Sequence, residues 1–251
     1  MKNHFITPYI GNKRGEVERI YEYIKDDIKK VKTIVEPFCG TSAMSYYIST
    51  LHPNKYKYIL NDNDEKLIEL YNIMKDKKRL KKFEKKVNEL AKTIDSKDKF
   101  LQIKKYDTIE AYYVLQKIYH LRPGMYDLNY IYKYIDIRGC PIVSFLHSED
   151  VEIRQGSGDD IVKEMRDDKR AFVFIDPPYL ISCNGFYNDP AGNIYEYFVK
   201  NKLDDMRAKI CLVLEVNWII LLLFDGYIKL EYPKAYNMSK QKTMHCLISN
   251  I

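Results

Sequence analysis

The residues best suited to chemistry are Asp176-Pro177-Pro178-Tyr179, which directly follow the apolar run Ala171–Ile175. That run predicts a buried central strand, and the prolines end it because they lack the N–H group that a sheet ladder needs. The Asp176 carboxylate and a carbonyl fixed by the prolines can accept both hydrogens of an exocyclic amine, so that its lone pair points at a methyl donor. Tyr179 would stack on the ring that carries this amine. The segment predicts methylation of a nucleobase amine; a strand that merely ends in a tight turn is the alternative.

A second candidate segment is Glu36-Pro37-Phe38-Cys39-Gly40, between the apolar strand Thr33–Val35 and the helical stretch Met44–Leu51. A strand, a turn of small residues and a helix open a doubly wound fold, and Gly40 lets a ligand approach the backbone closely. The turn departs from the G-x-G-x-x-G pattern of dinucleotide-binding proteins. A cofactor without a pyrophosphate is therefore expected.

Acidic residues follow the next predicted strand, Tyr56–Leu60. In doubly wound folds an acidic residue about 20 residues after the glycine turn holds ribose hydroxyls, and Asp62 has this position. Asp64 is instead expected to cap the helix Glu65–Met74. This part of the sequence therefore predicts a ribose-binding position at the end of the second strand.

The N-terminal loop contains Tyr9 and Lys13 and precedes a helix with apolar residues at helical spacing from Val17 to Val31. Such a loop can present an aromatic face and a cation to a ligand that carries a carboxylate. A solvated lysine in a glycine-containing turn is the alternative.

These segments occur in the order found in one known family. Tyr9–Lys13, Glu36–Ala43, Asn61–Asp64 and Asp176–Leu180 resemble the motifs of the Dam-type N6-adenine DNA methyltransferases, especially the bacteriophage enzymes. The resemblance implies methyl transfer from S-adenosylmethionine to a flipped-out adenine in double-stranded DNA, with S-adenosylhomocysteine as product and no metal. Catalysis is assigned by resemblance to Asp176, Pro177, Pro178 and Tyr179, and cofactor binding to Tyr9, Lys13, Glu36, Phe38, Gly40, Asp62 and Asp159.

Asp159 is assigned because the family places an acidic residue about one short helix before the catalytic motif, where it meets the cofactor adenine. The family often has an aromatic residue next, whereas this chain has Asp160. Residues 75–150 match the family least. Their counterpart is the target-recognition domain, and of its typical Gly-x-Phe-Asn-Val-Pro stretch only Gly139 and Pro141 are kept.

The expected DNA contacts in this middle region are Arg122, Lys133 and Arg138, while the recognised sequence is not predicted. The charged run Lys75–Lys86 fits either a solvated helix face or a surface that contacts phosphates. The segment Ile181–Asn193 fits a loop that closes over a flipped base or an ordinary surface loop.

The composition is that of a globular protein, with 46% hydrophobic and 30% charged residues in a chain of 251. A net charge of +6 is compatible with a polyanionic partner. The five cysteines are scattered without a C-x-x-C pair, which argues against a zinc site and a disulfide framework. The N-terminus has no signal-peptide pattern, and the apolar stretch Val216–Phe224 is too short to span a bilayer. A cytoplasmic protein of a bacterial, phage or viral host, monomeric or weakly dimeric, is expected.

The expected fold is α/β: a doubly wound, mostly parallel seven-stranded sheet with an antiparallel C-terminal hairpin and a small helical insertion. Residues 1–74 and 151–251 would form the catalytic domain, and residues 75–150 the inserted target-recognition domain. The late strands are predicted at Ile210–Asn217, Tyr227–Tyr232 and Thr243–Ile251, after a helix over Ile194–Arg207.

Other activities are compatible with the same motifs. Methylation of RNA adenine, or of a protein amide, would use the same kind of loop, although Asp rather than Asn at position 176 disfavours the amide. A non-catalytic nucleic-acid-binding relative would have no evident need for the Asp176 carboxylate. The resemblance also raises the role of modification enzyme in a restriction-modification pair.

Overall fold

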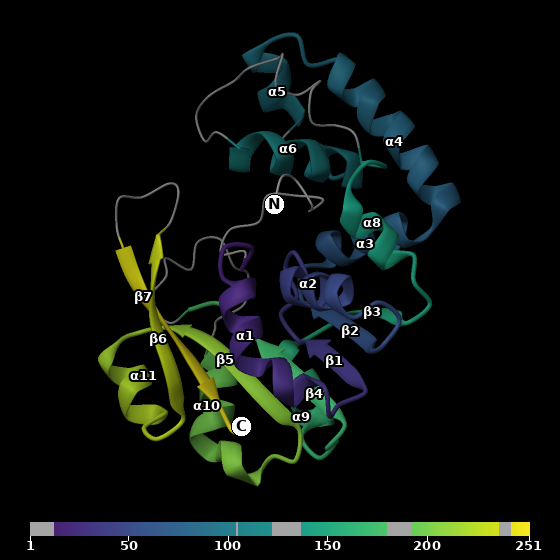
Figure 1. Cartoon of the computed structure of the whole chain (residues 1–251). Coiled ribbons are helices and arrows are strands. Elements are labelled where there is room, and N and C mark those ends of the chain that lie inside the picture. Colours follow the sequence, from purple (N-terminus) through teal and green to yellow (C-terminus); the bar gives the residue numbers. More distant parts are fainter. Residues whose placement is uncertain (1–12, 104, 122–136, 180–191, 236–241) are drawn as a thin grey trace.

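The computed structural model describes residues 13–103, 105–121, 137–179, 192–235 and 242–251. Their strands form one seven-stranded sheet in the order β3-β2-β1-β4-β5-β7-β6 (Figure 1). The first five strands of that order are mutually parallel, whereas β7 is antiparallel to both β5 and β6. The predicted fold class is therefore confirmed. The strands are β1 Thr33–Glu36, β2 Lys57–Asp62, β3 Val151–Gln155, β4 Ala171–Ile175, β5 Lys209–Glu215, β6 Ile228–Ala235 and β7 Lys242–Ser249.

Helices cover both faces of this sheet. The described ones are α1 Val17–Ile28, α2 Ala43–Leu51, α3 Glu65–Lys75, α4 Lys77–Lys92, α5 Lys97–Ile103, α6 Ile109–Leu121, α8 Pro141–Leu146, α9 Gly158–Met165, α10 Gly192–Lys200 and α11 Trp218–Leu223, with a 3-10 turn at Leu203–Asp205. Figure 1 shows α4, α5 and α6 as a group beyond the carboxyl ends of the central strands.

Strand β4 is buried at all of its residues, as its apolar sequence predicts. Successive side chains of a strand point to opposite faces, and β4 contributes to both core clusters accordingly. Phe172 and Phe174 pack in the cluster that contains α1, α2 and α3. Val173 and Ile175 pack in the other cluster, with α9 and α10. The sheet therefore has a covered core on each face, as a central parallel sheet requires.

Two elements end earlier than the sequence predicted. A single helix was expected over Ile194–Arg207, but α10 ends at Lys200. The Asn201 amide donates to the Tyr197 carbonyl at 2.9 Å, and a separate 3-10 turn follows. Asn217 was expected in a strand, but its side-chain oxygen accepts from the N–H groups of Ile219 and Ile220 and thereby begins α11. Among the described residues, no helix has the length and apolar character needed to cross a membrane.

The helices of residues 75–150 share a core with the sheet. Phe83 of α4 and Tyr113 of α6 belong to the same buried cluster as Phe172 of β4. The Phe145 ring of α8 meets the Tyr58 ring of β2 edge to face, with ring centres 5.1 Å apart. The division into a catalytic domain and an inserted domain remains a proposal, and α8 packs as part of the catalytic layer.

Candidate active site

The site lies where three parallel strands end side by side. Glu36 is the last residue of β1, Asp62 the last of β2, and Asp176 follows β4 directly. Because β2, β1 and β4 are adjacent and parallel, their carboxyl ends meet at one edge of the sheet. The sequence therefore folds so that three predicted site carboxylates gather on one edge.

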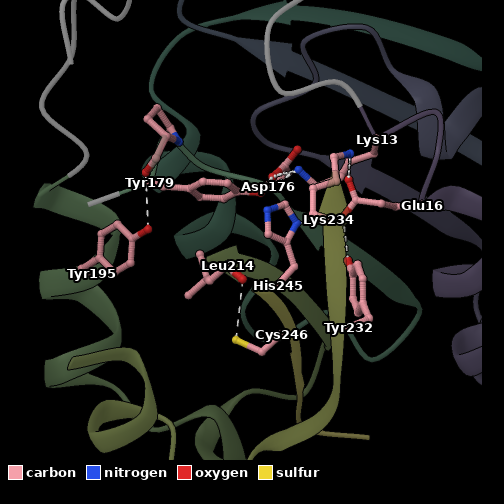
Figure 2. Close-up of polar contacts among 11 residues, drawn as sticks. Lys13, Glu16, Asp176, Tyr179, Tyr195, Leu214, Tyr232, Lys234, His245 and Cys246 are labelled. Carbon is pink, nitrogen blue, oxygen red and sulfur yellow. Dashed lines mark hydrogen bonds and ion pairs between the residues drawn. The ribbon is translucent and has the colours of Figure 1, made fainter. Parts of the chain in front are cut away.

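The Asp176 carboxylate is held by the N-terminal segment and by its own loop (Figure 2). Lys13 Nζ donates to Asp176 Oδ1 at 2.5 Å and to the Tyr179 hydroxyl at 2.8 Å. The Tyr179 hydroxyl in turn donates to the same Oδ1 at 3.2 Å. The Lys13 side chain is only 4% exposed and that of Asp176 19%. Burial raises the pKa of Asp176, and the nearby charge of Lys13 opposes that rise.

The rest of the catalytic loop is anchored to a helix and to the C-terminal hairpin. The Tyr195 hydroxyl of α10 donates to the Pro178 carbonyl at 3.3 Å, and Pro177 is buried. The Tyr179 ring is buried and meets the His245 ring edge to face at 5.3 Å, while Lys13 Nζ lies 5.2 Å from the centre of the Tyr179 ring. The stacking of Tyr179 on a base remains a prediction.

The glycine turn brings the backbone against Asp62. Gly40 has a φ of +45°, which glycine adopts at little cost, and its N–H donates to Asp62 Oδ2 at 2.8 Å. The Asp64 N–H donates to Asp62 Oδ1 at 3.1 Å. Burial raises the pKa of Asp62, and these backbone donors lower it. The Asp64 side chain caps α3, as predicted, by accepting from the N–H groups of Lys66 and Leu67.

Glu36 is a buried carboxylic acid at the end of β1, next to the glycine turn. It is 3% exposed, and its Oε1 accepts from the Ser45 N–H at 2.7 Å. Burial raises the pKa of Glu36 to about 7; the hydrogen bonds with Ser45 lower it, and the negative charge of Asp176 adds to the rise. Glu36 therefore changes its charge near neutral pH.

Phe38 and Asp159 lie at one wall of the site. A Cβ atom placed on Gly158 would be 2.4 Å from Phe38 Cζ, so the ring packs directly on the backbone at the start of α9. The Asn61 amide donates to the carbonyls of Pro37 and Gly156, which ties the glycine turn to the segment before α9. Asp159, the next residue of α9, is 8% exposed. These contacts bring Phe38 and Asp159 to the same side of the edge.

Some predicted residues lie elsewhere or outside the description. Tyr9, Arg122 and Lys133 are outside the described residues, as is most of the segment Ile181–Asn193. Arg138 has an exposed side chain, and its Nε pairs with the buried carboxylate of Glu84 on α4 at 2.6 Å. Within the described ranges, no three His, Cys, Asp or Glu side chains gather as a metal site would require.

Sequence reasoning missed a buried polar group beside Lys13. This group joins the turn before α1 to β6 and β7, and its members are Glu16, Tyr232, Lys234 and His245 (Figure 2). The available signal was weak: a charged residue three positions after Lys13 at the start of a helix is ordinarily solvated. Its partners lie more than 200 residues further along the chain, and no motif marks them.

The strand order and the carboxylates at the carboxyl edge define a protein of the methyltransferase type, and comparison with known proteins gives the family. The D12 class N6 adenine-specific DNA methyltransferase family matches residues 9–138, more than half of the chain, and the chain belongs to this family. The resemblance noted from the motifs is thereby confirmed, and the protein is an adenine methyltransferase.

One relative is the Type II methyltransferase M.CviBI of Paramecium bursaria Chlorella virus NC1A. It is 25% identical over an alignment of 270 positions, which covers 98% of this chain and 98% of that one. Among solved structures, a precorrin-6y C5,15-methyltransferase of Geobacter metallireducens matches with a TM-score of 0.40 at 9% identity, over 99% of this chain and 98% of that one. A human methyltransferase 10 domain containing protein matches with a TM-score of 0.39 at 10% identity, over 96% and 84%. At such scores these two likenesses do not establish the fold, which rests on the strand order itself.

Proposed function

We propose that this protein transfers the methyl group of S-adenosylmethionine to N6 of an adenine that is turned out of a DNA duplex. The observation that carries the proposal is the Asp176 carboxylate, set at the end of β4 beside Lys13 and Tyr179. Family membership supports adenine as the methylated base and DNA as its source. The name of the viral relative supports the role of modification enzyme in a restriction-modification pair.

The residues at the sheet edge fit S-adenosylmethionine, which would supply an electrophilic methyl group on a sulfonium. Asp62 Oδ2 accepts from the Gly40 N–H and Oδ1 from the Asp64 N–H. Because a carboxylate offers about four lone-pair sites, a ribose hydroxyl could also donate to it. By resemblance Asp159 is assigned to the cofactor adenine, and Glu36, Phe38 and Gly40 to its methionine part. Lys13 contacts Asp176 in this structure, so any role of Lys13 toward the cofactor carboxylate would be additional to that contact.

The catalytic loop would hold the substrate amine by its two hydrogens. Lys13 and Tyr179 both donate to Asp176 Oδ1, and we assign the other oxygen, Oδ2, to the adenine N6–H. The Pro177 carbonyl would accept the second hydrogen, and Tyr179 would contact the ring. Turning the adenine out of the duplex costs a few kcal/mol, roughly, which stacking and edge hydrogen bonds would offset. Catalysis would then come from orientation and from stabilisation of the charge that moves to nitrogen.

The exposed cations of α4 are proposed to contact DNA phosphates. Lys77, Lys78 and Arg79 occupy the first turn of this helix, where the helix dipole opposes positive charge. Lys81, Lys82, Lys85 and Lys86 continue the same face, so like charges recur at a spacing of four residues. Lys85 pairs with Glu89 at 3.8 Å and Lys86 with Glu110 at 3.2 Å, so ion pairs account for part of this face. Helix stability does not favour the clustering of the other cations, whereas an anionic partner would, and this favours phosphate contact over a merely solvated face.

The test is transfer of labelled methyl groups to adenine in duplex DNA, single-stranded DNA and RNA. We expect duplex DNA to be the preferred substrate, and preference for RNA would overturn the choice of DNA. We expect Asp176→Ala to lower the rate by at least about 100-fold, the scale of removing one positioned polar group. Calorimetric binding of S-adenosylhomocysteine should change by less than about 3-fold. Full turnover by Asp176→Ala at saturating cofactor would contradict the assigned mechanism.

A further inference from the structure

We propose that Glu16 is a positioning residue for methyl transfer, acting on Asp176 through Lys13; this inference rests on the proposed function. Glu16 precedes α1 and lies in no segment that resembles a family motif. Its side chain is nevertheless only 4% exposed. The acidic residues of α1 itself, in contrast, are exposed or partly exposed. A buried carboxylate this close to Lys13 needs a physical reason.

The Glu16 carboxylate collects donors from both strands of the C-terminal hairpin. Oε2 accepts from the Tyr232 hydroxyl of β6 at 2.8 Å, and it lies 2.8 Å from His245 Nδ1 of β7. Oε1 accepts from Lys234 Nζ of β6. Burial would raise the pKa of Glu16, but the His245 hydrogen bond and the charges of Lys13 and Lys234 lower that pKa to about 2. Because an ionised carboxylate only accepts, Nδ1 of His245 must carry the shared hydrogen.

The same carboxylate is not used to cap its own helix. Glu16 is the N-cap residue of α1, yet its side chain makes no capping hydrogen bond. The backbone instead closes a tight turn, because the Lys13 carbonyl accepts from the N–H of Glu16 at 2.7 Å and from that of Val17 at 2.9 Å. The anchored Glu16 therefore fixes the position from which the Lys13 side chain starts.

These contacts link Glu16 to the catalytic loop along two paths, one through Lys13 and one through His245. Lys13 reaches Asp176 and Tyr179, the Tyr179 ring packs on His245, and His245 returns to Glu16 (Figure 2). The contacts thus hold three segments against one another: the turn before α1, the loop after β4 and the hairpin β6–β7. A lysine side chain has several rotatable bonds, so anchoring its backbone reduces the positions from which Nζ can reach Asp176. This gives Glu16 an effect on the reacting group without contact to substrate.

The experiment compares Glu16→Gln in the natural chain and in a chain that carries Lys13→Met. In the natural chain we expect Glu16→Gln to lower kcat by roughly 10-fold or more, with KM for DNA and for cofactor changed less than about 3-fold. In the Lys13→Met chain, single-turnover transfer should fall by less than about 3-fold on adding Glu16→Gln. Glu18→Gln, an exposed neighbour on α1, is the matched control and should leave kcat unchanged.

A purely structural role for Glu16 predicts a different result. Its loss would then lower the rate by the same factor in both backgrounds, and that outcome would overturn the proposal, as would unchanged kcat in a folded Glu16→Gln protein. If melting curves show that Glu16→Gln does not fold, Tyr232→Phe decides, since it removes one hydrogen bond and keeps the carboxylate. We expect Tyr232→Phe to lower kcat less than Glu16→Gln does, and to cause no further loss in a chain that already carries Lys13→Met. Absence of adenine methylation by the natural chain would instead contradict the proposed function.

Discussion

Glu36 is a buried carboxylic acid, and its ionisation lowers the stability of the folded state. Its pKa is about 7 in the folded protein and 4.5 when unperturbed. Between these pH values the folded chain keeps a proton that the unfolded chain has lost, so the free energy of unfolding falls as pH rises from 4.5 to 7 and stays low above it. The difference corresponds to about 3 kcal/mol.

Glu36→Gln should remove this dependence on pH. We expect the variant to be more stable than the natural chain at pH 8, by about 2 to 3 kcal/mol, and the difference to shrink toward pH 4.5. Urea unfolding of both proteins across this range measures it. Because Glu36 is assigned to the cofactor, the variant should also bind S-adenosylhomocysteine more weakly. Parallel stability curves for the two proteins would contradict the raised pKa.

At the scale of residues, the site residues that belong to sequence motifs could be predicted. The site residues that are far apart in the sequence and meet only in the folded chain were missed. Glu36, Asp62 and Asp176 each follow an apolar run that marks a strand end, so their meeting at one edge followed from the rule for parallel sheets. Glu16 and His245 are 229 positions apart, and their contact depends on how α1 lies against β7. Local pattern contains no information on that placement.

The helix α9 begins at a glycine whose missing side chain makes room for Phe38. We expect Gly158→Ala to displace the Phe38 ring, because the new Cβ would lie 2.4 Å from Cζ. Overpacking of this kind costs roughly 1 to 3 kcal/mol of stability. The displaced ring would also lose its contact with the cofactor, and a loss of about 1.4 kcal/mol there lowers the affinity for S-adenosylhomocysteine by about 10-fold. Gly15→Ala is the matched control, since nothing lies within 4 Å of its added Cβ. Natural affinity in Gly158→Ala would argue against Phe38 as a cofactor contact.

The basic face of α4 can be tested through the salt dependence of DNA binding. Each phosphate contact contributes about 0.9 to the slope of log affinity against log salt. Changing Lys78, Lys81 and Lys82 together to Gln should therefore reduce the slope by about 2 to 3 if all three contact phosphates. The control changes Lys25, Lys29 and Lys30 to Gln; each of these pairs with an acid three residues before it. An equal, small change in both proteins would indicate a merely solvated face.

At the scale of elements, apolar periodicity predicted the buried strands and, to within one residue, the starts of α1, α2 and α3. It did not mark β3, which reads Val-Glu-Ile-Arg-Gln and lies at the edge of the sheet. An edge strand needs few apolar residues, and Arg154 is held there by Glu152 and Glu164 rather than by burial. The early end of α10 was also missed. The Asn201 side chain donates to the Tyr197 carbonyl there, and the spacing of apolar residues does not predict such a side-chain hydrogen bond.

Over the whole molecule, the core continues from the sheet into the helices of residues 75–150. Phe83 of α4 is 3% exposed and packs edge to face on Tyr113 of α6 at 5.6 Å, in the cluster that also holds Phe172 of β4. A shared core of this kind favours unfolding of the sheet and the helices in one event. The division into a catalytic domain and an inserted domain stays a proposal, and we expect no separate unfolding of the two parts.

Phe83→Ala tests this cooperativity. Removing the ring should lower the free energy of unfolding by about 3 to 5 kcal/mol and shift one calorimetric transition to lower temperature. Amide hydrogen exchange in β4 should accelerate to the same degree as in α4, since both would open in the same event. Phe224→Ala, in the cluster on the other face, is the matched control and should shift the same single transition. Faster exchange in α4 with unchanged protection in β4 would instead establish two independent units, because the sheet would then persist while the helices open.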